Sequence, residues 1–122
     1  MAITGAHVLL YTTKPDELRA VLRDIFEWKY VDAGDGWLIF RLPPAELGIH
    51  PIENDDEEPE NAHQFTLMCD NIQTTVQELQ KKGIEILGAP EEQGWGVTVM
   101  LNLPGDVRVM LYQPKHPVAI NS

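Results

Sequence analysis

The stretch LPGDVRVMLYQP, residues 103–114, decides how the rest of the chain is interpreted. Its Pro-Gly pair predicts a turn, and the alternating apolar residues from Val107 onward predict a strand. Successive side chains of a strand point to opposite faces of its sheet. Val109 and Leu111 should therefore pack in the core, which leaves Met110 and Tyr112 on the other face together with Arg108.

The same order of elements occurs twice along the 122 residues. The first half should contain a strand over 6–12, a helix within 13–28, and strands over about 28–33, 36–42 and 45–52. The second should contain a strand over 63–70, a helix from Asn71 to Gly83, and strands over 84–90, 95–103 and 107–114. We predict one α+β domain, 1–122, made of two βαβββ modules. The first half covers about 4–52, the acidic connector 53–61, and the second half about 62–115.

Two such modules side by side predict a curved, cupped mixed sheet with the helices on its convex face. By strand alternation, Leu47 and Ile49 should pack beneath the helices, as should Val8 and Leu10. A concave face that mixes polar and apolar side chains is typical of a small-molecule pocket. The candidate ligand-binding residues on it are His7, Tyr11, Glu46, His50, Gln64, Met68, Met110 and Tyr112.

Charge and composition exclude several other classes of protein. The formal net charge is −10, but six of the 19 acids lie in the connector ENDDEEPE, and the other 13 face nine Lys and Arg, a balance of −4. These few scattered cations disfavour nucleic-acid binding, and no apolar run approaches the roughly 18 residues of a membrane span. Cys69 is the single cysteine, so no disulfide framework is expected. The expected location is the cytoplasm of a bacterium, and the Pro-broken end 114–122, with His116, should be peripheral.

The chain resembles the vicinal oxygen chelate superfamily, which includes glyoxalase I, extradiol dioxygenases, and fosfomycin- and bleomycin-resistance proteins. The resemblance rests on AHVLLYTTKPDELRAVLRDIFEWKYVD (6–32), MCDNIQTTVQELQKKGIEILGAPEEQGWG (68–96) and NLPGDVRVMLYQP (102–114). Glu27 stands where a glycine is usual, and Leu103 replaces the usual aspartate before Pro-Gly. The resemblance implies the paired-module fold and a ligand site inside the cup.

Metal-using members of that superfamily take one ligand from each of four strands. The resemblance places these positions here at His7, at Glu46 (or His50, one pleat further along), at Gln64 and at Met110. An amide oxygen is a weak donor, and a thioether is too soft for zinc, nickel, manganese or iron(II). We therefore assign no metal ligands and expect no cofactor. A divalent metal would be needed only if the protein is a metal-dependent lyase or dioxygenase.

Three functions are compatible with these residues. The first is a protein that binds or sequesters a ligand, cationic or aromatic, without a catalytic metal. The alternative is a metal-dependent lyase or dioxygenase using His7 and Glu46, with His50 or Gln64 as a third group. A third is a metal-free enzyme with His7 or Glu46 as catalytic base, so whether the chain is an enzyme stays open. The strands over 6–12 and 63–68 carry no charged residue, and such edges favour pairing, here in a homodimer.

Overall fold

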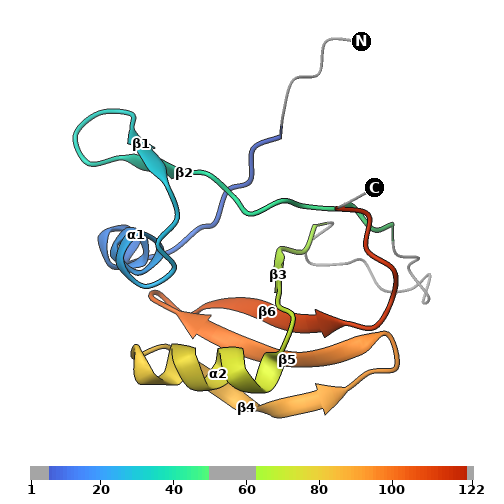
Figure 1. The fold of residues 1–122 in the computed structure, drawn as a ribbon. Helices are drawn as coiled ribbons and strands as arrows, with labels where there is room; N and C mark the ends of the chain where they lie inside the picture. Colours follow the sequence, from blue (N-terminus) through green and yellow to red (C-terminus); the bar gives the residue numbers. More distant parts are fainter. Residues whose placement is uncertain (1–5, 50–62, 121–122) are drawn as a thin grey trace, which may run out of the picture.

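The computed structural model describes residues 6–49 and 63–120. This part of the chain forms an α+β fold with a two-stranded sheet and a four-stranded mixed sheet (Figure 1). Its elements in chain order are α1 (Pro15–Asp24), β1 (Tyr30–Asp32), β2 (Leu38–Phe40), β3 (Thr66–Met68), α2 (Ile72–Lys81), β4 (Glu85–Glu92), β5 (Gly96–Leu103) and β6 (Val107–Pro114).

The four-stranded sheet is the framework of the molecule, with the strand order β3-β6-β5-β4. The hairpin expected from the Pro-Gly turn is confirmed: β5 and β6 pair antiparallel from Gly96 opposite Pro114 to Leu103 opposite Val107. β3 adds to the other edge of β6 in parallel orientation. β4 pairs with β5, and its register shifts between Leu87 and Glu91. The predicted strands of the second half are thus all present.

The hydrophobic core lies on one face of this sheet. Val99, Leu101, Val109 and Leu111 are at most 5% exposed, as the alternation in β5 and β6 predicts. They cluster with Leu18 and Leu22 of α1 and with Ile72 and Val76 of α2. The partly buried Phe65, Leu67 and Cys69 pack against the same cluster, in agreement with the sequence.

The two helices form where the apolar spacing predicts them, but they begin differently. The Asn71 side chain accepts a hydrogen bond from the backbone N–H of Thr74, which caps α2 as expected. At the start of α1, Lys14 occupies the N-cap position and makes no side-chain cap, while Pro15 opens the helix. Each helix has 10 residues, and neither is long and apolar enough to cross a membrane.

The first half departs from the predicted module. Its β1–β2 hairpin turns through Gly34, Asp35 and Gly36, all at positive φ, and lies beside α1, apart from the four-stranded sheet (Figure 1). The strands expected over 6–12 and 45–52 are absent from the described residues 6–12 and 45–49, because no other described segment offers them a backbone ladder. The prediction that Leu47 and Ile49 pack is wrong in this chain, since they are 87% and 86% exposed. The connector 53–61 lies outside the described residues.

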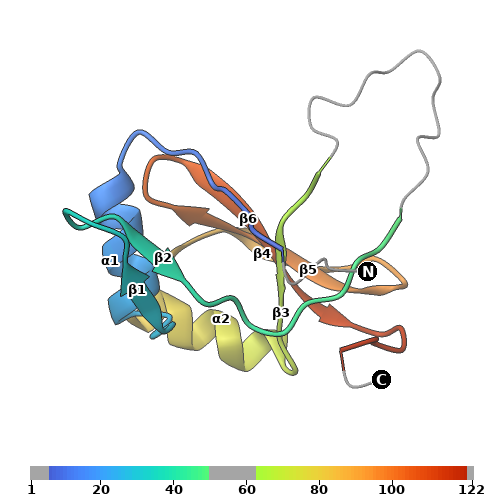
Figure 2. The ribbon, with the colours of Figure 1, turned by 90° about the horizontal axis from the view of Figure 1, so that it is seen from above.

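One contact ties the start of the chain to the second half. The Thr12 hydroxyl donates a hydrogen bond to the Pro104 carbonyl, 2.8 Å away, so the segment before α1 runs beside the β5–β6 turn (Figure 2). Gly105 in this turn has φ +83°, and a Cβ placed there would lie 1.8 Å from Thr12 Oγ1. Glycine is thus required both by the backbone conformation and by the close approach of Thr12.

Gly105→Ala should lower the free energy of unfolding by about 3 kcal/mol, because left-handed strain and overpacking add. Gly88→Ala is the matched control: Gly88 also has positive φ, but nothing lies within 4 Å of an added Cβ. The control should cost about 1 kcal/mol, from strain alone. Urea unfolding measures both values, and equal losses would show that the contact with Thr12 does not constrain the turn.

Candidate functional site

The sheet face opposite the core carries a continuous set of side chains from three strands. Met110 lies opposite Thr66 on β3 and Met100 on β5, and Tyr112 lies opposite Met68 and Thr98. Directly opposed residues share a sheet face. We call this set the Met110 face: Thr66, Met68, Thr98, Met100, Met110 and Tyr112.

The Met110 face changes character along β6. At Met110 it is formed by Met100, Met110 and Thr66, all half-buried, and the half-buried Met68 lies further along, opposite Tyr112. Methionines adapt to the shape of an apolar surface. Around Tyr112 it is buried and polar: Tyr112 is 9% and Thr98 7% exposed, and Thr98 Oγ1 accepts a hydrogen bond from Gln93 Nε2 at 3.2 Å. Burial, and secondarily the Glu46 carboxylate, raises the pKa of the Tyr112 phenol. The hydroxyl is therefore protonated and able to donate near neutral pH.

Gln64 and Met110 lie together, as the predicted ligand positions require. The Gln64 amide Nε2 is 3.9 Å from the Met110 sulfur and donates to it. A thioether is a weak acceptor, so this contact contributes little energy. It does show that a neutral amide and a soft sulfur lie next to each other at this point of the face.

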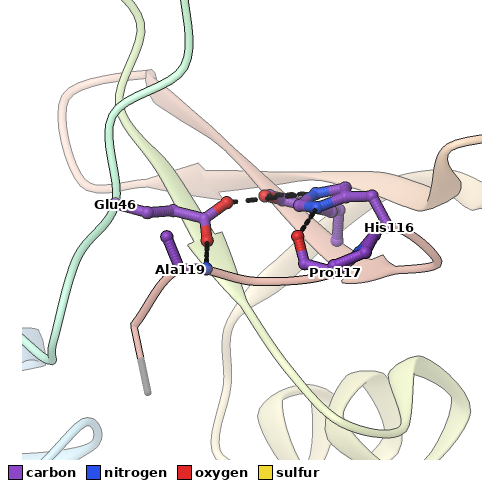
Figure 3. Close-up of polar contacts among 5 residues, drawn as sticks. Glu46, His116, Pro117 and Ala119 are labelled. Carbon is purple, nitrogen blue, oxygen red and sulfur yellow. Dashed lines mark hydrogen bonds and ion pairs between the residues drawn. The ribbon is translucent and has the colours of Figure 1, made fainter. Parts of the chain in front are cut away.

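Glu46 reaches the site from the first half of the chain and meets the C-terminal segment 115–120 (Figure 3). Its Oε1 accepts a hydrogen bond from the Ala119 backbone N–H at 2.8 Å, and its Oε2 is 4.0 Å from His116 Nε2. The same His116 nitrogen is 3.4 Å from the Tyr112 hydroxyl. Glu46 thus lies at the Tyr112 end of the face, away from the Gln64–Met110 pair.

Aromatic rings gather at this end. The Trp95 and Tyr112 rings meet edge to face with centroids 5.5 Å apart, and the Tyr112 and His116 rings are 6.0 Å apart. Trp95 is half exposed, so the group has an open side. His116 was expected to be peripheral, and sequence reasoning missed it because prolines flank it on a tail with no periodic pattern.

The remaining predicted site residues do not gather here. His7 is exposed, and its side chain makes no hydrogen bond or ion pair with another described residue. Tyr11 is 84% exposed. His50 lies outside the described residues. The site that can be described therefore consists of the Met110 face, Gln64, and the Glu46–His116 contact.

The donors in this site do not fit a divalent metal ion. Within residues 6–49 and 63–120, no three His, Cys, Asp or Glu side chains gather so that they could share an ion. Gln64 and Met110 are poor donors for such an ion, which leaves Glu46 as the one carboxylate of the described site. No metal-dependent step is derived from this arrangement.

The chain belongs to the glyoxalase/bleomycin resistance protein/dioxygenase superfamily, whose family model matches residues 5–111. This confirms the resemblance found in the sequence. No curated protein sequence matches the chain.

Several solved structures share the fold along nearly the full length. TnmS3, an antibiotic binding protein from Streptomyces sp. CB03234, is 18% identical, with 94% of this chain and 99% of that chain covered and a TM-score of 0.66. A lactoylglutathione lyase from Agrobacterium tumefaciens is 16% identical, with 91% and 93% covered and a TM-score of 0.62. The fosfomycin resistance protein FosX from Listeria monocytogenes is 17% identical, with 94% of each chain covered and a TM-score of 0.60. At these identities the likeness concerns the fold.

Proposed function

We propose that this protein binds, and thereby sequesters, a small molecule on the Met110 face without a catalytic metal. The observation that carries the proposal is the contact between Gln64 and Met110, an amide and a thioether, at two positions that the resemblance assigns to the superfamily's metal ligands. Such a pair keeps the shape of a ligand site while removing its affinity for a hard cation.

The chemistry of the face suits an aromatic or largely apolar ligand. Met68, Met100 and Met110 offer polarizable surface that can adapt to a ring, with sulfur–aromatic contacts of roughly 0.3–1.5 kcal/mol each. Tyr112 and Thr98 supply a few fixed polar groups at one end, which is how ligand sites orient an otherwise apolar molecule. Binding of this kind requires no bond to be made or broken in the ligand.

The likeness to an antibiotic binding protein supports small-molecule binding by this chain, but it does not identify the ligand. TnmS3 is described as an antibiotic binding protein, whereas the Agrobacterium protein is a lyase, so the fold accommodates both activities. A metal-dependent lyase or dioxygenase here would rely on His7 and Glu46. No observation among the described residues favours that alternative, because Glu46 contacts the C-terminal segment and His7 is exposed.

We further propose that the cup is completed in a homodimer. The segments 6–12 and 41–49 present Leu9, Leu47 and Ile49 to solvent, at 53%, 87% and 86% exposure, and have no strand partner in the described chain. Apolar segments with free backbone groups favour pairing with another chain. Pairing with a second copy would cover these side chains and would bring His7 and Tyr11 out of solvent and toward a ligand site.

The ligand-binding proposal is tested by methyl NMR with a panel of aromatic antibiotics. A bound ligand should shift the methyl signals of Met68, Met100 and Met110 and should leave those of Leu101 and Val109, on the core face, in place. The reason is that ring currents act over a few ångströms and these two sets lie on opposite faces. Shifts confined to residues outside the Met110 face would contradict the assignment of the site.

The dimer is tested by light scattering on the full chain at micromolar concentration. We expect a mass of about twice the 13.8 kDa of one chain. Leu47→Lys should shift the mass toward one chain, because it places a charge in the proposed contact, while Lys82→Glu, at the exposed end of α2, serves as control. A mass of one chain for the unmodified protein at all concentrations would refute the dimer.

A further inference from the structure

The C-terminal segment 115–120 forms part of a polar cluster that the sequence did not predict. Three distant parts of the chain meet in it: Glu46 from the first half, Tyr112 from β6, and His116 with Ala119 from the segment itself (Figure 3). Glu46 and Ala119 are separated by 73 positions in the sequence. The Tyr112 end of the Met110 face is therefore bordered by Glu46 and by the C-terminal segment.

The hydrogen bonds of His116 define what its ring offers to a ligand. His116 Nδ1 is 2.8 Å from the Pro117 carbonyl oxygen, which can only accept, so Nδ1 carries a proton. In the neutral ring Nε2 is then the acceptor, and it lies 3.4 Å from the Tyr112 hydroxyl. The cluster thus presents an imidazole lone pair beside a phenol that stays protonated.

The Glu46 carboxylate has one oxygen in use and one available. Oε1 accepts from the Ala119 N–H, which shows that a donor already fits at this position. Oε2 accepts no hydrogen bond from the described residues, and His116 Nε2 lies 4.0 Å from it, beyond hydrogen-bond distance. The Glu46 side chain is 19% exposed, so the carboxylate is partly desolvated but reachable.

The charges around the cluster leave it negative when the imidazole is neutral. Besides Glu46, the charged residue next to His116 is Lys115, and the one cation on β6, Arg108, lies at the other end of that strand from Tyr112. Lys115 is paired with Glu92, so its charge is compensated locally. The rings of Trp95, Tyr112 and His116 add electron-rich faces to the Glu46 carboxylate. A carboxylate next to aromatic rings is an arrangement that attracts organic cations.

We propose that Glu46, Tyr112 and His116 form a subsite for the ammonium group of an aromatic amine. The ammonium donates to Glu46 Oε2 and to His116 Nε2, where it takes the place of the Tyr112 hydroxyl that lies 3.4 Å away. The rest of the molecule extends over the methionines of the Met110 face. His116 is thereby a ligand-contacting residue, and the C-terminal segment is one wall of the site. This proposal rests on the proposed function, since it assumes that the Met110 face binds the body of the ligand.

The test uses three probes of one shape: benzylamine, benzyl alcohol and phenylacetate, titrated at pH 7.5 and monitored by the methionine methyl and Trp95 indole signals. Benzylamine, which is cationic at this pH, should bind at least about tenfold more tightly than benzyl alcohol, and phenylacetate should bind most weakly. Glu46→Gln should reduce the preference for the amine to about twofold or less. Glu78→Gln removes the same charge from an exposed carboxylate on α2, outside the cluster, and should leave the preference intact.

A second variant tests the subsite independently, in case Glu46→Gln does not fold. His116→Phe keeps a ring beside Tyr112 and removes the acceptor, so it should weaken benzylamine binding about fivefold and leave benzyl alcohol unchanged. Unshifted Leu101 and Val109 methyl signals show that each variant is folded. Equal binding of all three probes to the Met110 face would overturn the ammonium subsite while leaving the proposed function in place. No shift of any Met110-face signal by any probe would overturn both.

Discussion

The antiparallel pairing of β5 with β6 fixes which side chains face the helices and which face away. Its register runs without interruption from Gly96 opposite Pro114 to Leu103 opposite Val107. A slip of one residue would exchange the buried Leu101 and Val109 for Met100 and Met110. That exchange would expose the core and bury the proposed site. The hydrophobic gain from packing Val99, Leu101, Val109 and Leu111 against the helices therefore determines where Met110 and Tyr112 point.

This constraint explains why the second half could be predicted from sequence in detail. Val99 and Leu101 on β5 and Val109 and Leu111 on β6 alternate with less buried residues, the turn carries Pro-Gly, and α2 begins at a capping asparagine, so local signals and packing agree. The first half lacks that agreement. Residues 6–12 and 45–49 have strand-like composition, but a strand needs a neighbour with free backbone groups, and sequence does not show whether one is within reach. The alternation of Leu47 and Ile49 therefore predicted burial that the described chain does not provide.

In the candidate site, too, the sequence predicted the residues on regular strands but not those on irregular segments. Met68, Met110 and Tyr112 were placed on one face by parity, and the strand register confirms that they share it. His116 could not be placed in this way because it lies on a Pro-flanked segment whose course depends on a contact with Glu46 across 73 positions. The one available signal was the position of Glu46 itself: a carboxylate on an inward-facing position of a predicted strand requires a donor, and a histidine in a nearby tail is a candidate. The need of the Glu46 carboxylate for a hydrogen-bond donor, rather than the periodicity of the sequence, indicates His116 as its partner.

Solved structures that share this fold include a lyase and an antibiotic binding protein, so the fold alone does not decide the function. The central claim is that the amide of Gln64 and the thioether of Met110 leave this protein without a catalytic metal. The most direct test is the metal content of the full chain, purified without chelator and measured by elemental mass spectrometry after dialysis. The account predicts well under one equivalent of any transition metal per chain, together with no rise in melting temperature on adding zinc, nickel or manganese. A stoichiometric ion in the native protein would contradict it and would move the metal-dependent enzyme into first place.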